Sequence, residues 1–334
     1  MVQPVASKVV VDVPHRISGF FEIVDHKLPN DYVLDDLLSI GSRGGGPCLS
    51  ECGVTAVEVD EHGEPGSVKI FINGEDCADG AKTTRSVIKW MAEDAVNDIA
   101  ITIKHDFPML MGAGYGSSGS GALGTAIALN VLLDMGLSLN ECGKFAHCAE
   151  VENKTGLGTI GGQVRGGCTI SMVPGFPFTM ASIILPPGIK IACATRGGLS
   201  TAQMLSDPDI RKNIISSGKT AMASIVEHYT IENFTRIAIE FVNSTWMNFL
   251  EQLDLGAVKN VMDAVNADRE GKTGHVLGAS MNQMGKSVYC IYGASTDAEE
   301  YIDHVFVENG FDDVKFLDFN SCGPSIRRVE QTRV

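Results

Sequence analysis

A run of glycine and serine at residues 112–126, GAGYGSSGSGALGTA, constrains the fold of this chain more than any other feature. Glycine lets backbone N–H groups point at a ligand without obstruction by a Cβ atom. The alanine-rich apolar residues that follow predict a helix over about 119–134, whose N-terminus would add free amides and a partial positive charge. We therefore expect a phosphate-binding loop followed by a helix; the alternative is a plain serine cap on that helix.

Two familiar phosphate motifs fit this run only in part. Gly114 to Gly119 matches GxGxxG, but the preceding predicted strand ends near Lys104, and the acidic Asp134 falls at a helix end instead of a strand tip. The same two glycines have the spacing of a P-loop, yet Ser120 stands where that motif requires lysine. Neither a dinucleotide fold nor a Walker-type loop is therefore favoured.

Length and element order predict an α+β protein of two domains. A chain of 334 residues is longer than most domains built around a single hydrophobic core. A composition break near residue 185 suggests domains at 1–185 and 186–334. Strands and helices alternate too irregularly for a doubly wound sheet. Alternating residues on both sides of the turn at 62–66 predict a β-hairpin, and Asn140 is the expected N-cap of a helix over 140–154.

Charge and cysteine usage limit the partners. A net charge of −15 disfavours nucleic acid and anionic membranes, so a small-molecule ligand is expected. No apolar run is long enough to span a bilayer, and the N-terminus lacks the features of a signal peptide. The nine cysteines include no CxxC pair, which argues against zinc ribbons and disulfide frameworks and favours a reducing cytoplasm. A homodimer is a common assembly for such a protein.

The segment PMLMGAGYGSSGSGALGTA resembles the signature loop of the GHMP kinases, a family named for galacto-, homoserine, mevalonate and phosphomevalonate kinases. Two more blocks follow the family order: VPHRISGFFEIVD at 13–25 and GASMNQMGKSVYCIYG at 278–293. The resemblance implies an N-terminal domain like domain 2 of ribosomal protein S5 and a C-terminal ferredoxin-like α/β sandwich. It also implies that the ligands are ATP and Mg²⁺.

Within this family, the segments GSRGGGPCLSECG and AEVENKTGLGT are similar to those of the archaeal pantoate kinase branch. That resemblance implies phosphorylation of pantoate to 4-phosphopantoate for coenzyme A synthesis. Two alternatives stay open: another GHMP kinase that acts on mevalonate, homoserine or a sugar, or a nucleotide-binding member without transferase activity.

The resemblance also implies roles for individual residues. The nucleotide would be held by Gly112, Gly114, Gly116, Ser117, Ser118, Gly119 and Ser120. Glu150 falls where the family keeps its Mg²⁺-binding glutamate, with the hydroxyls of Ser118 and Ser120 as further metal ligands and Ser120 also in the catalytic set. Thr159 stands where the family commonly has a catalytic aspartate, and because a threonine cannot act as a base at neutral pH we expect it to orient the substrate.

The acceptor is expected to carry a carboxylate, which calls for cations and amides. The candidate substrate-binding residues are Arg16, Ser42, Arg43, His147 and Arg165. Arg165 is expected to take over from an arginine that related enzymes carry near Ser171. His147 lies three residues before Glu150 and so shares its helix face. A structural role for each of these side chains is the alternative.

Overall fold

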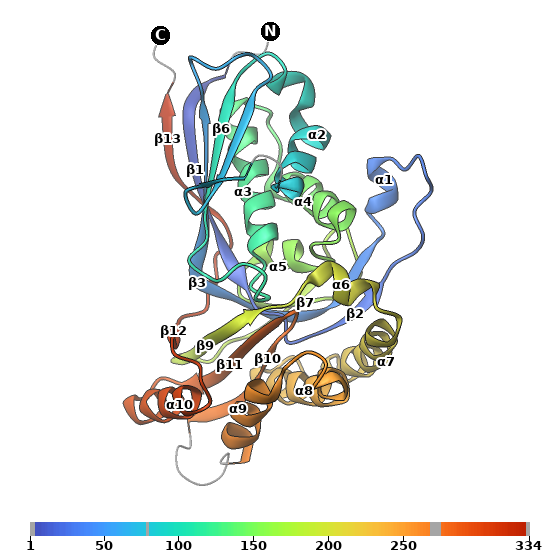
Figure 1. The fold of residues 1–334 in the computed structure, drawn as a ribbon, viewed down its shortest axis with the longest axis vertical. Helices are drawn as coiled ribbons and strands as arrows, with labels where there is room; N and C mark the ends of the chain where they lie inside the picture. The colour runs from blue at the N-terminus through green and yellow to red at the C-terminus, as the bar shows by residue number, and fades with distance from the viewer. Residues whose placement is uncertain (1–3, 78–79, 268–274, 332–334) are drawn as a thin grey trace.

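Two β-sheets with helices packed on them make up the fold, so the α+β prediction is confirmed. The computed structural model describes residues 4–77, 80–267 and 275–331. The larger sheet lies in the upper half of Figure 1 and the smaller one beneath it, with the glycine-rich loop where they meet. Among the described residues, no helix is both long and apolar enough to cross a bilayer.

The larger sheet has the strand order β13-β1-β3-β6-β4-β5, with β2 and β7 also paired to β3, and β8 paired to β7. Its strands are β1 (Ala6–Arg16), β2 (Phe20–Val24), β3 (Gly41–Val59), β4 (Val68–Ile72), β5 (Glu75–Asp76), β6 (Ile101–Asp106), β7 (Cys168–Ser171), β8 (Met180–Ile183) and β13 (Ser325–Gln331). The long strand β3 joins two regions, because its first half pairs with β2 and β7 and its second half with β1 and β6.

The predicted hairpin around residues 62–66 is wrong. Strand β6 lies between the two expected partners, antiparallel to β3 and parallel to β4. Alternation of apolar residues predicts a strand but does not specify its partner. Strand β6 takes the position between β3 and β4 because its side chains Ile101 and Ile103 are fully buried, whereas β4 buries only Ile70.

Helices α2 (Lys82–Val96), α3 (Ser117–Leu132) and α4 (Leu139–Asn153) cover one face of this sheet. Helix α3 is buried on nearly every side, because it packs against β1, β3, α2 and α4, and it starts two residues before the predicted position. The short helices α1 (Leu34–Leu37) and α5 (Thr159–Arg165) complete this half.

The N-cap of α4 is Ser138, and the expected cap Asn140 is the second residue of the helix. Ser138 wins because Glu141 follows it by three residues and forms a reciprocal capping box. The N-cap therefore lies two residues earlier than expected, and the C-terminal half of α4, which carries the candidate site residues, is as expected.

The smaller sheet has the order β10-β11-β9-β12. Its strands are β9 (Ile189–Gly198), β10 (Val276–Asn282), β11 (Gly285–Gly293) and β12 (Lys315–Leu317). The helices of this half are α6 (Thr201–Ser206), α7 (Pro208–Ile225), α8 (Ile231–Ser244), the 3₁₀ turn η1 (Trp246–Phe249), α9 (Gly256–Ala267) and α10 (Thr296–Glu308). Trp246, Phe234 and Tyr289 are fully buried in its core.

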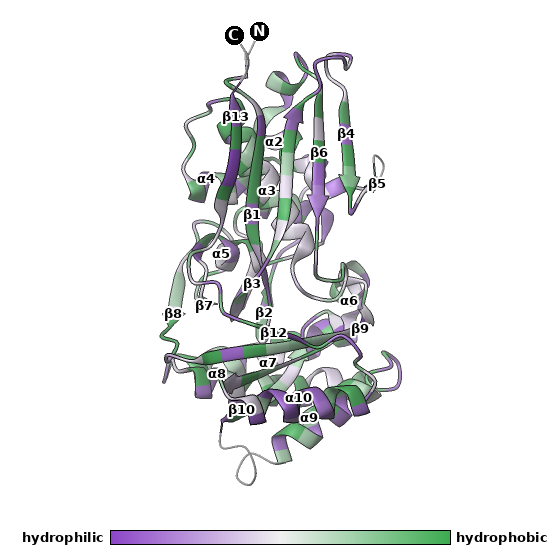
Figure 2. Ribbon diagram, turned by 90° about the vertical axis from the view of Figure 1, so that its left-hand side faces the viewer, coloured by the Kyte–Doolittle hydropathy of each residue, from purple (hydrophilic) through white to green (hydrophobic). Residues whose placement is uncertain are grey.

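The last strand, β13, returns to the larger sheet and pairs with β1 at its edge. Figure 2 shows that this edge strand is largely hydrophilic. Both ends of the described chain therefore lie at the same end of the molecule (Figure 1). The expected boundary near residue 185 falls between β8 and β9 and stays a prediction.

Candidate functional site

A cleft of about 460 Å³ opens where the two sheets meet. Five segments that are far apart in sequence line it: the end of β1 with β2, the start of β3, the start of α2, the glycine-rich loop, and residues 154–159 after α4. The first residues of α6 and the turn at 283–284 close it from the side of the smaller sheet. The three blocks that the family resemblance singled out thus come together here.

The glycine-rich loop needs its glycines for backbone geometry. Gly112, Gly114 and Gly116 have φ angles of 74°, 88° and 68°, in the left-handed region that disfavours other residues. Gly116 is the N-cap of α3 and supplies no side-chain cap. The first amides of α3 therefore have no partner within the helix and lie at the cleft.

Ser117, the first residue of α3, adds a second indication of a ligand. Its side chain lines the cleft and is 7% exposed, yet the Oγ atom is buried without a hydrogen-bond partner. A buried hydroxyl without a partner costs free energy comparable to a lost hydrogen bond. An anion with several acceptor oxygens, seated at the start of α3, would satisfy this hydroxyl and the free amides together.

The smaller sheet holds the loop from outside. Ser287 of β11 donates to the carbonyl oxygen of Ala113 at 2.8 Å, and the amide of Leu199 donates to that of Gly112 at 3.0 Å. A Cβ atom on Gly114 would lie only 2.2 Å from the carbonyl oxygen of Gln283. The loop and the turn before β11 are thus packed too closely for any side chain between them.

Gln163 of α5 holds the loop from inside. Its Nε2 atom donates to the carbonyl oxygens of Pro14 at 3.0 Å and Gly116 at 3.1 Å, and the side chain is fully buried. The carbonyl oxygen of Tyr115 accepts from the backbone amide of Arg16 at 3.0 Å. These contacts fix the direction in which α3 starts.

Of the expected nucleotide residues, Gly112, Gly114, Gly116, Ser117 and Ser118 line the cleft. Gly119 and Ser120 are not among the lining residues. Ser120 is fully buried and its hydroxyl donates to the carbonyl oxygen of Val13 at 3.1 Å, so it ties α3 to β1. Ser118 alone of the two candidate metal-binding serines lies at the cleft.

Glu150 lies directly behind the cleft and is 1% exposed. Its Oε1 atom accepts from the hydroxyl of Thr155 at 2.6 Å. Burial raises the pKa of this carboxyl, while hydrogen bonds from Thr155 and Ser118 act in the opposite direction. Ser118 and Glu150 are therefore brought together, as the predicted metal site requires.

Arg16 and Ser42 both line the cleft and are both buried. The Arg16 guanidinium donates from Nη1 to Thr169 Oγ1 at 2.8 Å and from Nη2 to the Thr169 carbonyl oxygen at 3.1 Å. Gly162 of α5 makes room for it, since a Cβ there would lie 1.2 Å from Nη1. Arg16 is thus a preorganised buried cation at the cleft wall.

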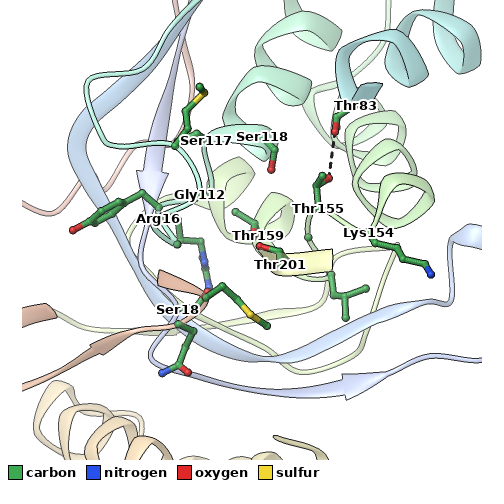
Figure 3. A pocket seen from close by; sticks show the side chains of 18 of the residues that line it. Arg16, Ser18, Thr83, Gly112, Ser117, Ser118, Lys154, Thr155, Thr159 and Thr201 are labelled. Atoms are coloured by element: carbon green, nitrogen blue, oxygen red, sulfur yellow. Dashed lines mark hydrogen bonds between the residues drawn. The ribbon is translucent and has the colours of Figure 1, made fainter. Parts of the chain in front are cut away.

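Thr159 lines the cleft at the first position of α5. Figure 3 shows it facing the same space as Ser118 and Thr155, with Arg16 on the other side. Its methyl group lies against the loop, because a Cβ on Gly116 would come within 2.6 Å of its Cγ2 atom.

Three expected substrate residues are not among those that line the cleft. Arg43 pairs with the buried carboxylate of Glu22. His147 is buried, shares a 3.0 Å hydrogen bond through Nε2 with the Ile40 carbonyl oxygen, and has a pKa lowered to about 4 by burial. Arg165 is exposed at the end of α5.

Several lining residues were missed from the sequence, namely Ser18, Lys82, Thr83, Lys154 and Thr155. Lys82 and Thr83 begin α2, and Lys154 ends α4 in a left-handed conformation with φ of 55°. The signal for Lys154 and Thr155 was present, since ENKTG at the end of a helix marks a turn. No such signal marked the start of α2.

The charge of the cleft differs from that of the whole chain. Arg16, Lys82 and Lys154 line it, while no aspartate or glutamate among residues 4–77, 80–267 and 275–331 does. The whole chain carries a net charge of −15. A cleft with this local field attracts an anionic ligand despite the acidic surface.

The donor set around Glu150 fits Mg²⁺ better than a transition metal. Within the described parts of the chain, no cluster of three or more histidine, cysteine, aspartate or glutamate side chains could hold an ion. Mg²⁺ does not need one, because it is commonly held by one or two carboxylates together with substrate phosphates and water. One buried carboxylate beside the Ser118 hydroxyl matches that pattern.

Comparison with known proteins relates this chain to one family of kinases. Residues 82–164, from the start of α2 through most of α5, match the model of the GHMP kinases N terminal domain. A pantoate kinase of Methanocaldococcus jannaschii is 28% identical over 282 residues, which is 83% of this chain and 90% of that protein. A pantoate kinase of Thermococcus kodakarensis is 30% identical over 236 residues, covering 70% of this chain and 74% of that protein.

Solved structures share the complete fold. One described as a phosphotransferase related to the CoA biosynthesis pathway superposes with a TM-score of 0.78 at 22% identity, over 96% of this chain and 99% of that one. A homoserine kinase from Cytophaga hutchinsonii gives a TM-score of 0.64 at 16% identity, over 96% and 97% of the two chains. The predicted two-sheet α+β architecture of these kinases is therefore confirmed.

Proposed function

The chain belongs to the GHMP kinase family, and we propose that it transfers the γ-phosphate of ATP to the primary hydroxyl of pantoate. The product would be 4-phosphopantoate, a precursor for coenzyme A synthesis in the cytoplasm. The pantoate kinases that match over most of this chain support the choice of acceptor.

The observation that carries the proposal is the unsatisfied N-terminus of α3. The Ser117 hydroxyl has no partner, the N-cap Gly116 offers no side chain, and both residues line a cationic cleft. The triphosphate of ATP supplies acceptor oxygens and negative charge for all of these groups. Preorganised donors of this kind are the main contribution of a protein to phosphoryl transfer.

Glu150 and Ser118 are the residues that would hold Mg²⁺. The ion would supply charge neutralisation for the phosphate oxygens. What this chain contributes is a buried carboxylate and a hydroxyl at the first turn of α3. Ser120 is left out of this arrangement because its hydroxyl already binds Val13.

The acceptor carboxylate would bind Arg16. A guanidinium has five N–H donors, which is more than the two bonds to Thr169 use. Phe20, Phe21 and Leu205 line the cleft as an apolar wall. Pantoate has a carboxylate at one end and a branched apolar carbon beside its hydroxyl, so it complements both features.

Thr159 orients the acceptor hydroxyl in this proposal and does not remove its proton. Its side chain faces the same space as Ser118 (Figure 3). The proton would pass to an oxygen of the transferred phosphoryl group, since little base assistance is needed before the bond to the leaving group is largely broken.

A coupled ADP-release assay with a panel of hydroxy acids tests the function. The panel contains pantoate, mevalonate, homoserine and a hexose, each with saturating ATP and Mg²⁺. Turnover with pantoate above all others supports the proposal. Turnover with another member would favour a different GHMP kinase, and ATP binding without turnover on any acceptor would favour a nucleotide-binding member.

We also propose that the protein is a homodimer, a common assembly for a protein of this kind. Light scattering behind a sizing column would give about twice the chain mass of 35.6 kDa. A monomer of full activity would contradict the assembly without affecting the site.

A further inference from the structure

Glu150 presents its two carboxylate oxygens to different surroundings. Oε1 accepts the hydroxyl of Thr155 at 2.6 Å. Oε2 lies beside two glycines, because a Cβ atom would come within 2.2 Å of it at Gly156 and within 3.4 Å at Gly119. Oε1 is therefore held by Thr155, and Oε2 faces the first turn of α3, where Ser118 also donates to this carboxylate.

Thr155 is itself held in place on both sides. Its backbone amide donates to the carbonyl oxygen of Glu150 at 3.0 Å, just after the left-handed turn at Lys154. Its Oγ1 atom lies 3.3 Å from Thr83 Oγ1 at the start of α2. The dashed line in Figure 3 marks this contact between the two threonines.

The hydroxyl protons of Thr83 and Thr155 can be assigned in only one way. The carboxylate can only accept, so the single hydroxyl proton of Thr155 points at Glu150 Oε1. Thr83 must then be the donor to Thr155. Thr83 at the start of α2 and Thr155 just after α4 thus fix one oxygen of a buried acid, while its other oxygen lies against the first turn of α3.

We propose that Thr155 is a positioning residue that orients Glu150 toward the divalent cation of the bound nucleotide, with Thr83 supporting it from α2. This inference rests on the proposed function, because it takes Glu150 as the metal-binding carboxylate. Without the Thr155 bond the carboxylate would rotate, and Oε2 would no longer be held against the start of α3. Loss of such an outer hydrogen bond commonly weakens metal binding by about 10- to 100-fold.

A purely structural role for Thr155 makes a different prediction. If the hydroxyl only ended helix α4, its loss would reduce stability and would affect nucleotide binding equally with and without metal. The backbone bond from Thr155 to Glu150, which ends the helix, is unchanged by any side-chain substitution. The metal dependence of binding therefore separates the two roles.

The test is isothermal titration of the wild type and variants with a non-hydrolysable ATP analogue, once with excess Mg²⁺ and once with EDTA. For Thr155→Val, which keeps the shape but removes the donor, we expect metal-free affinity within about twofold of the wild type and a gain from Mg²⁺ about tenfold smaller. Thr155→Ser restores the donor and should restore the gain. Thr220→Val, at an exposed position of α7 outside the cleft, should leave the gain unchanged.

An unchanged Mg²⁺ gain in Thr155→Val would overturn the inference while leaving the proposed function intact. Equal wild-type affinity with and without Mg²⁺ would overturn the metal role of Glu150, and the inference with it. If Thr155→Val does not fold, Thr83→Val takes its place, because it leaves both Thr155 and Glu150 present. If Mg²⁺ raises the affinity of Thr83→Val by about two- to threefold less than that of the wild type, the proposed support of Glu150 by Thr83 through Thr155 holds. An unchanged effect of Mg²⁺ overturns it.

Discussion

Substituting Gly116 by alanine should destabilise the protein through two separable effects. The residue has φ of 68°, where a Cβ atom costs about 1–2 kcal/mol. The new Cβ would also lie 2.6 Å from Thr159 Cγ2, an overlap of the kind that costs about 1–3 kcal/mol in a packed site. The lower conformational entropy of the unfolded alanine variant offsets about 0.4–1 kcal/mol of this loss. We expect a net loss of about 1–5 kcal/mol in the free energy of unfolding, the sum of these terms.

The second effect can be removed by a second substitution. Thr159→Ser deletes Cγ2 but keeps the hydroxyl, and the next atom, Gln163 Nε2, is at an ordinary 3.5 Å from the added Cβ. The double variant should therefore recover about 1–3 kcal/mol relative to the sum of the single changes, a coupling that urea denaturation of all four proteins measures. Strictly additive losses, or a Gly116→Ala variant as stable as the wild type, would refute the deduced contact between the loop and α5.

Three further predictions follow from the site and its burial. Arg16→Met should raise the Michaelis constant for pantoate by about 10- to 100-fold and that for ATP by less than threefold, because a hydrogen-bonded charge is lost. The matched control Arg165→Met, at an exposed arginine, should change neither constant. Equal effects of Arg16→Met on both constants would exclude a role of Arg16 in binding the carboxylate. Thr159→Ala should keep kcat within about tenfold of the wild type, whereas a loss above about 10³-fold would mean that the hydroxyl is essential. Burial lowers the pKa values of His15, His105 and His147 to about 4, so between pH 6.5 and 4 the unfolded chain binds more protons than the folded one. The free energy of unfolding should therefore fall as the pH falls through that window, by about 3 kcal/mol per histidine at pH 4. His147→Gln should reduce the slope of the free energy of unfolding against pH, measured by urea titration.

The glycine-rich loop and the helix after it could be predicted because their signals are local. Left-handed glycines and a following apolar run specify a turn and a buried helix without reference to the rest of the fold. The position of Glu150 beside Ser118 was also predictable, although only through the resemblance to a family, since nothing in the spacing joins residues 118 and 150.

Strand pairing and side-chain direction could not be predicted in the same way. The partner of β4 is decided by which strand buries more apolar surface, a property of the assembled sheet. Ser120 and His147 have the right residue type near the right motif, yet one binds Val13 and the other contacts Ile40. Helical spacing groups His147 with Glu150, but the elements packed on either side of α4 draw the two side chains to different partners.

The cations of the cleft show the same limit. Lys82 and Lys154 come from the start of one helix and the end of another, and only the packing of α2 against α4 brings both to the cleft. A net charge of −15 led us to expect a pocket whose field differs from that of the whole chain, but it does not tell which cations line that pocket. Arg16 was identified because it lies within a motif, whereas the lysines belong to none of the three blocks.

The most direct measurement is a crystal structure with a non-hydrolysable ATP analogue, Mg²⁺ and pantoate. The account predicts phosphate oxygens within hydrogen-bond distance of the Ser117 hydroxyl and the first amides of α3, with the pantoate carboxylate on Arg16. A triphosphate bound elsewhere, with the start of α3 still without a ligand, would contradict it.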